Sequence, residues 1–156
     1  MSWDASREDS AIRSYRLHHV LSGGDVAERQ IADRDHLWAW EAVAEAAMDG
    51  SLPLSVVDGL LHDPEADDWY RECIAAGPIE DLLSYHAARH AKSIAERCEA
   101  DPVWAWTMGG VWIDREQWLT LPASLRKLVP EPIEQVEGHK RSKRPSKRQG
   151  KRPRHP

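Results

Sequence analysis

Two histidines four residues apart, His86 and His90, form the pattern in this sequence that comes nearest to a metal site. On a helix this spacing places both imidazoles on one face, where they can share a metal ion with a third ligand such as Asp81. The intervening run Ala87-Ala88-Arg89 has no glutamate beside the first histidine, so the zinc-protease pattern H-E-x-x-H is absent. Both histidines also lie in an otherwise apolar stripe, where an imidazole more often bonds to a backbone carbonyl or a neighbouring side chain. We therefore expect no metal and no other cofactor.

Two further groupings hold side chains of the kinds that enzymes use. Glu80 and Asp81 are adjacent, so on a helix their side chains diverge by about 100° and cannot act as acid and base on one substrate atom. Capping or helix-dipole roles account for both carboxylates. The run Ser84-Tyr85-His86 contains a nucleophile and a base, but the sequence offers no oxyanion site, no strained elbow and no glycine-rich phosphate loop. The sequence therefore favours a protein that is not an enzyme.

The last eighteen residues, His139 to Pro156, are the most definite functional feature of the chain. They hold nine Lys or Arg, no Asp or Glu, and no apolar residue except proline. Since nothing offsets the entropy lost on ordering them, we expect a disordered tail that binds polyanions by counterion release. The alternatives are a tail that only aids solubility, or one that folds back on the body. The candidate polyanion-binding residues are Lys140, Arg141, Lys143, Arg144, Lys147, Arg148, Lys151, Arg152 and Arg154.

The formal net charge of −5 combines two opposite parts. Because the tail carries +9, residues 1–138 hold 12 basic and 26 acidic side chains, a balance of −14. This balance argues against nucleic-acid binding by the folded body and favours a protein partner. Cys73 and Cys98 are too few for a disulfide framework and fall on apolar helix positions. With no apolar leader and no stretch of membrane-spanning length, we expect a cytoplasmic protein without a membrane contact.

Helices are the elements that must position these side chains. Apolar periodicity predicts them over about 6–21, 35–49, 51–62, 67–76, 78–100 and from 102, with short pieces near Asp114 and Pro122, whereas 25–34 reads as helix or loop. No run keeps a strand's period of two. We predict an all-α fold: a compact bundle of about six helices over 1–129, a linker over 130–138 and the tail over 139–156. A match between residues 35–40 and 101–106 leaves a HEAT-like stack of hairpins as an alternative.

Capping and breaking residues set the expected ends of the two central helices. Asp35 is expected to cap the helix over 35–49, and Gly50 to end it in the left-handed conformation. That helix is apolar on nearly every side, so we expect it to be buried. One thin acidic stripe interrupts it, made of Glu41, Glu45 and Asp49. Gly77-Pro78 is expected to end one helix and open the next.

Tryptophan is the dominant aromatic residue, with eight copies against three tyrosines and no phenylalanine. Such large amphipathic rings fill a core or anchor an interface. We expect them to pack in the core, with a tryptophan-lined binding surface as the alternative. On the helix over 67–76 we expect Trp69 and Cys73 to be buried.

The start of the helix over 78–100 resembles a known family. The run from Ala76 to Leu83 reads A-G-P-I-E-D-L-L and is followed by Tyr85-His86 and, later, by a G-V-W run. It is similar to a bacterial family of domains of unknown function that shares A-G-P-(L/I)-E-D-L-L and a closing G-V-W, and the likeness spans 37–112. Where that family usually has glycine after the histidine, this chain has Ala87. The motif residues, of unknown role, are Ala76, Gly77, Pro78, Ile79, Glu80, Asp81, Leu82, Leu83, His86, Gly110, Val111 and Trp112.

The resemblance implies a compact helical domain in a bacterium or its phage, and it implies no activity. The basic tail is an addition to what the family shares. Three functions remain open at this level. The first is a non-enzymatic interaction module, whose body docks a protein partner and whose tail contacts nucleic acid or another polyanion. The second is a metal-binding protein or enzyme that uses the face of His86 and His90. The third is a small immunity or antitoxin-like protein.

Overall fold

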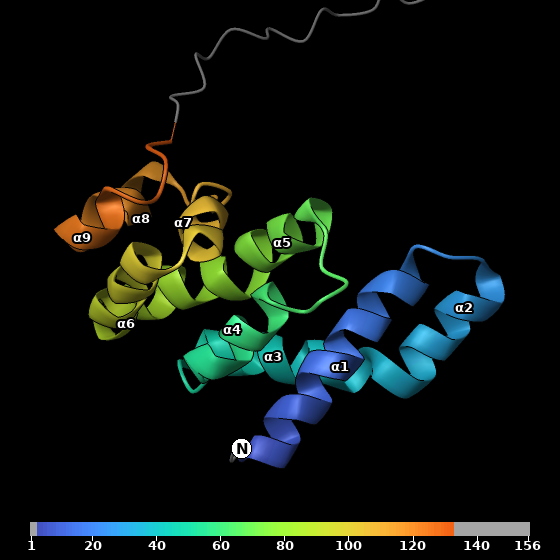
Figure 1. Cartoon of the computed structure of the whole chain (residues 1–156). Coiled ribbons are helices and arrows are strands. Elements are labelled where there is room, and N and C mark those ends of the chain that lie inside the picture. The colour runs from blue at the N-terminus through green and yellow to red at the C-terminus, as the bar shows by residue number, and fades with distance from the viewer. Residues whose placement is uncertain (1–2, 133–156) are drawn as a thin grey trace, which may run out of the picture.

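The structure is a computed structural model that describes residues 3–132. Every regular element within this range is helical, which confirms the predicted all-α fold (Figure 1). The predicted tail over 139–156 lies outside the described residues. The elements are α1 (Ala5–Ser22), α2 (Val26–Ile31), η1 (Ala32–His36), α3 (Leu37–Asp49), α4 (Leu54–Leu61), α5 (Asp68–Ile74), η2 (Ala75–Ile79), α6 (Glu80–Ala100), α7 (Pro102–Met108), α8 (Arg115–Thr120) and α9 (Ala123–Arg126).

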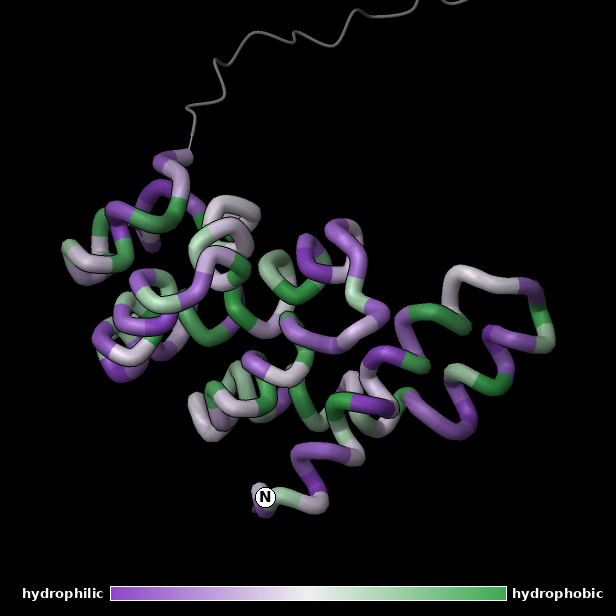
Figure 2. The backbone as a smooth tube through the Cα atoms, viewed as in Figure 1, coloured by the Kyte–Doolittle hydropathy of each residue, from purple (hydrophilic) through white to green (hydrophobic). Residues whose placement is uncertain are grey.

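The helices follow one another from one end of the molecule to the other. Figure 1 shows α1 and α2 at one end, α8 and α9 at the other, and α3 to α5 between them. Helix α1 packs on α3 and α4, while α6 packs on α3, α7 and α9. Hydrophobic and hydrophilic stretches alternate along the helices, as expected for elements that each bury one face (Figure 2). The largest fully buried side chains include Val43, Leu60, Ile74, Ile79, Leu82, Ile94 and Trp104.

Two π-helical turns, η1 and η2, carry the chain through positions where the sequence predicts breaks. The expected break at Gly77-Pro78 is wrong, because α5 runs through η2 into α6. Proline lacks an N–H and crowds the carbonyl four residues earlier. The wider π turn relieves this conflict, and the N–H of Glu80 donates to the carbonyl of Ala75 instead. The helix therefore changes register at the resembling motif and does not stop there.

The predicted cap at Asp35 is also wrong. Helix α2 continues through η1 into α3, so residue 35 lies inside a continuous helix. Both carboxylate oxygens of Asp35 accept hydrogen bonds from Arg34, at 2.7 and 2.6 Å, and none from a helix N–H. The C-terminal end of α3 agrees with the prediction, since Gly50 ends the helix in the left-handed conformation with a φ of 76°.

The tryptophans mostly contradict the expected core packing. Trp104 alone among the eight is classed as buried, and Trp3 and Trp118 are half-buried. Five rings are exposed, namely those of Trp38, Trp40, Trp69, Trp106 and Trp112. Trp69 was expected inside, but on α5 it is Tyr70 and Ile74 that face the core, and Cys73 is half-buried. The exposed rings favour the alternative of a tryptophan-lined surface.

The two copies of the repeated hexapeptide occupy different structural positions. Asp101 caps α7 through the N–H of Val103, whereas Asp35 caps nothing. Trp104 is fully buried, whereas its counterpart Trp38 is exposed. The match between 35–40 and 101–106 therefore does not mark a duplicated hairpin.

A polar cluster centred on Asp58 joins α4, α6 and α7. The carboxylate of Asp58 accepts from Nε and Nη2 of Arg97, each at 2.9 Å, and from Nε1 of Trp104 at 2.7 Å. The Arg97 guanidinium also lies 5.9 Å from the centre of the Trp104 ring. One carboxylate thus holds a guanidinium and an indole in a single arrangement, which no local spacing in the sequence indicates.

Candidate functional site

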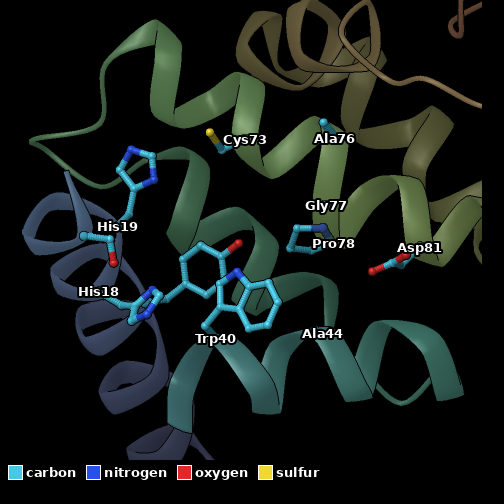
Figure 3. Close-up of a pocket in the computed structure, with 11 residues that line it drawn as sticks. His18, His19, Trp40, Ala44, Cys73, Ala76, Gly77, Pro78 and Asp81 are labelled. Atoms are coloured by element: carbon cyan, nitrogen blue, oxygen red, sulfur yellow. The ribbon is translucent and has the colours of Figure 1, made fainter. Parts of the chain in front are cut away.

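A pocket of about 410 Å³ opens where α1 and α3 face the η2 turn. Its volume falls in the range of roughly 300–1,000 Å³ typical of ligand sites. Figure 3 shows Trp40 between His18 on one side and Pro78 and Asp81 on the other. The lining residues are Tyr15, His18, His19, Ser22, Trp40, Ala44, Cys73, Ala76, Gly77, Pro78 and Asp81.

Ring contacts fix the aromatic wall of this pocket. The His18 ring lies 6.4 Å from the Trp40 ring, and Nε2 of His18 lies 3.9 Å from a carboxylate oxygen of Asp33 on η1. Tyr15 and His19 both meet the buried Tyr70 ring edge-on, at 6.3 and 5.0 Å. The wall is therefore held from three helices before any ligand arrives.

Asp81 is the one carboxylate that residues 3–132 contribute to the pocket lining. Partial burial raises its pKa above the ordinary aspartate value. Within the described residues it has no hydrogen bond and no ion pair, whereas the neighbouring Glu80 accepts from the backbone N–H of Trp112 at 3.3 Å. The two carboxylates diverge, as their adjacency predicts, and only Asp81 offers a free negative group to the pocket.

Burial also shifts the pKa of two other groups in the pocket lining. Burial lowers the pKa of His19, so its imidazole is neutral at pH 7. Burial also raises the pKa of the Cys73 thiol, with further contributions from Glu72 and Asp67. A protonated thiol is a poor nucleophile. The pocket combines aromatic rings with one carboxylate, which is a chemistry for binding cations.

The metal candidates His86 and His90 lie against the turn between α3 and α4. Nε2 of His86 lies 2.8 Å from the carbonyl oxygen of Met48, and because a carbonyl only accepts, this nitrogen carries the proton. The ring packs on Gly50, where a Cβ would lie 2.8 Å from its Cγ. His90 is desolvated, which lowers its pKa, and its Nε2 is buried without a partner in the described residues. Across residues 3–132 no group of three or more His, Cys, Asp and Glu has a metal-binding arrangement.

An exposed apolar stripe continues from the pocket along α3 and α6. Trp40, Ala44 and Met48 are spaced by four on α3 and so share one face. Asp81 and Tyr85 are likewise four residues apart on α6 and share one face of that helix. The rings of Trp40 and Tyr85 and the side chain of Met48 are all exposed. The acidic stripe of α3 is exposed beside it, as predicted, through Glu41, Glu45 and Asp49.

The resembling motif divides between the pocket and the core. Ala76, Gly77, Pro78 and Asp81 line the pocket, while Ile79, Leu82 and Leu83 are buried in the core. Gly110 lies against Ala75, Val111 is buried, and Trp112 is 78% exposed. The motif therefore both shapes the π turn and supplies one wall of the pocket.

The opposite wall comes from residues that sequence reasoning did not select. Tyr15, His18 and His19 on α1 and Trp40 on α3 are far from the motif along the chain, and no local spacing connects them to it. The nine basic residues from Lys140 to Arg154 lie outside the described residues. None of the described helices is both long and apolar enough to cross a membrane.

Comparison with known proteins gives one match. A model of the family of unknown function DUF6869 matches residues 27–122. This span includes α3 to α8 and the whole resembling motif. No curated protein and no solved structure matches the chain. The predicted membership in a family of unknown function is thereby confirmed, while the motif as a family signature and a bacterial origin stay predictions.

Proposed function

The chain belongs to the DUF6869 family of unknown function, and on that premise we propose that it is a non-enzymatic interaction module. Its helical body docks a basic segment of a protein partner along the pocket and the stripe of Trp40, Met48 and Tyr85. Its tail attaches to nucleic acid or another polyanion. The observation that carries the proposal is the pocket itself, which presents the exposed ring of Trp40 and, among its described lining residues, the unpaired carboxylate of Asp81.

The charge of the body favours a basic partner. Residues 3–132 contain 24 Asp and Glu against 12 Lys and Arg. The acidic stripe of α3 runs beside the exposed apolar stripe, so a segment that carries both apolar and basic side chains meets a complementary surface. An immunity or antitoxin-like role, in which the body neutralises a basic protein, is a special case of this function.

Docking is tested first by locating the partner on the surface. The photo-crosslinking residue p-benzoylphenylalanine is placed at position 85 in the full chain, in the cells where the protein occurs, and the adduct is identified. The purified partner is then titrated against the Trp40→Ala and Trp106→Ala variants. These rings are matched, since they are 46% and 47% exposed. We expect Trp40→Ala to weaken the Kd about tenfold or more, as for an interface anchor, and Trp106→Ala by less than about twofold. Equal effects, or no protein adduct at position 85, would contradict docking at this surface.

The tail is tested with duplex DNA at 50 and 200 mM salt. We expect the full chain to bind and a truncation ending at Gly138 not to bind. If five of the nine basic residues contact phosphates, affinity falls about 500-fold between the two salt concentrations. The truncation keeps the described core, whose last buried residue is Val129. Equal binding by the two proteins would rule out the tail as the polyanion site.

A further inference from the structure

We propose that the pocket at η2 is a binding site for a cationic side chain, and that its occupant is an Arg or Lys of this chain's own residues 139–156. The inference rests on the proposed function and extends it, because the tail then has two competing binding sites. One is the polyanion and the other is the pocket of the body.

The body already contains one complete example of this recognition, in which a carboxylate and an indole ring hold a guanidinium. Where α4, α6 and α7 meet, Asp58 pairs with Arg97, and the guanidinium stands over the Trp104 ring. The pocket repeats two of the three members, a carboxylate and an indole, as Asp81 and Trp40. No Lys or Arg lines the pocket in the described part of the chain. A guanidinium or ammonium group entering it gains both the ion pair and the ring face.

The neutral groups of the lining favour the same ligand. His19 is uncharged at pH 7 and the Cys73 thiol is protonated, so neither neutralises Asp81. A carboxylate that is partly desolvated without a partner is destabilised, and a cation that joins it removes this cost. A negatively charged ligand would meet Asp81 without any described Lys or Arg in the lining to offset it.

Gly77 leaves space at the pocket for a close approach. A Cβ added there would meet no atom within 4 Å, and its φ is not in the left-handed region. Gly77 precedes Pro78, and a residue without a Cβ also eases the clash with the proline Cδ in a helical turn. The open space beside Gly77 lets an occupant approach the η2 backbone.

The C-terminal segment has the length and charge to be that occupant. Residues 133–156 follow the last described position, and nine of them are Lys or Arg. Fully extended, the 22 residues from 133 to 154 span roughly 75 Å. A compact domain of 130 residues has a radius of gyration of about 14 Å, so its far side is within reach. The opposite charges of body and tail raise the frequency of the encounter.

The direct test uses a fluorescent peptide with the sequence of residues 139–156 and the protein truncated after Gly138, at 50 mM salt. Asp81→Asn and Glu80→Gln form a matched pair, because each removes one carboxylate from the same helical turn. We expect Asp81→Asn to weaken the peptide Kd about tenfold and Glu80→Gln by less than about twofold. Likewise, Trp40→Leu is expected to weaken it about tenfold and Trp106→Leu by less than about twofold. A peptide that does not bind, or equal losses in the two carboxylate variants, would overturn the proposal.

A second variant guards against loss through misfolding. Gly77→Ala is expected to fold, since a Cβ there meets no atom within 4 Å apart from its chain neighbours, and yet to weaken the peptide Kd about fivefold, because its methyl group takes up space at the η2 backbone. Unchanged peptide binding by this variant would contradict the close approach.

The full chain shows whether the segment binds its own body. If the pocket competes with DNA for the tail, Asp81→Asn tightens DNA binding about threefold relative to Glu80→Gln, although both variants have the same net charge. Equal DNA affinities would refute self-binding and leave the proposed attachment of the tail to polyanions standing. Peptide binding to the pocket without DNA binding by the full chain would instead refute that attachment and support the pocket.

Discussion

Replacing Asp58 by alanine is expected to lower the free energy of unfolding by about 2–3 kcal/mol and the Tm by roughly 9 °C. The change removes the acceptor of Nε1 of Trp104, a fully buried indole, and leaves that donor unpaired. It also removes the three hydrogen bonds of the Arg97 guanidinium to the carboxylate, two from Nε and one from Nη2. Since Asp58 and Arg97 are each about one third exposed, water recovers part of the loss, and we take less than the full cost of breaking a buried pair.

Urea unfolding measures this effect, with Glu96→Ala as the control. Glu96 pairs with Lys92 at 3.8 Å on the exposed side of α6, and such a pair contributes less than about 0.5 kcal/mol. Losses of similar size in the two variants would show that the cluster of Asp58, Arg97 and Trp104 does not stabilise the contact of α4, α6 and α7.

Replacing Gly50 by alanine is expected to cost about 2–3 kcal/mol. Its φ of 76° is unfavourable for a residue with a Cβ by about 1–2 kcal/mol. The new methyl would also lie 2.8 Å from Cγ of His86, whose ring is held by the carbonyl of Met48. Either the ring or the α3–α4 turn must move, and the hydrogen bond at 2.8 Å is lost or weakened.

Gly77→Ala is the matched comparison and should cost much less. In η2 the added methyl meets no atom apart from its chain neighbours, and the gain in helix propensity, about 0.5–1 kcal/mol, offsets the clash with Cδ of Pro78. Thermal unfolding of both glycine variants separates the two cases. Comparable losses in both variants would mean that the space at Gly77 is required by the fold and not by a ligand.

Local sequence patterns identified most of the helices because the physics behind them is local. On α4 the predicted face of Val56, Val57, Leu60 and Leu61 is fully buried. Asp101 caps α7 with Pro102 in its first turn, and Asp114 caps α8. Caps and apolar periodicity act within a few residues, so they can be read from the sequence alone.

The two π turns could not be read in the same way. Gly77-Pro78 is a strong local signal for a break, but packing of α5 and α6 on one core keeps the helix continuous and places the conflict in a wider turn. The tryptophans show the same limit, because their size predicts burial and only the assembled surface reveals that five are exposed.

The candidate site was only half visible from sequence. The motif marked the wall formed by Ala76, Gly77, Pro78 and Asp81, and adjacency indicated that Glu80 and Asp81 would diverge. The aromatic wall from α1 and α3 depends on how distant segments pack, which no spacing reports. Conversely, His86 and His90 had a metal-like spacing, and the fold places them against the turn at Gly50.

The claim that the η2 pocket binds the basic segment is tested most directly by locating the contact in solution. The measurement is a ¹H–¹⁵N NMR titration of labelled residues 1–138 with the unlabelled peptide 139–156. We predict the largest shifts at the indole N–H of Trp40 and at the backbone amides of Gly77, Ile79, Glu80 and Asp81, with the indole of Trp106 unchanged. Shifts confined to the acidic stripe of Glu41, Glu45 and Asp49, or spread evenly over the surface, would contradict a specific site at the pocket.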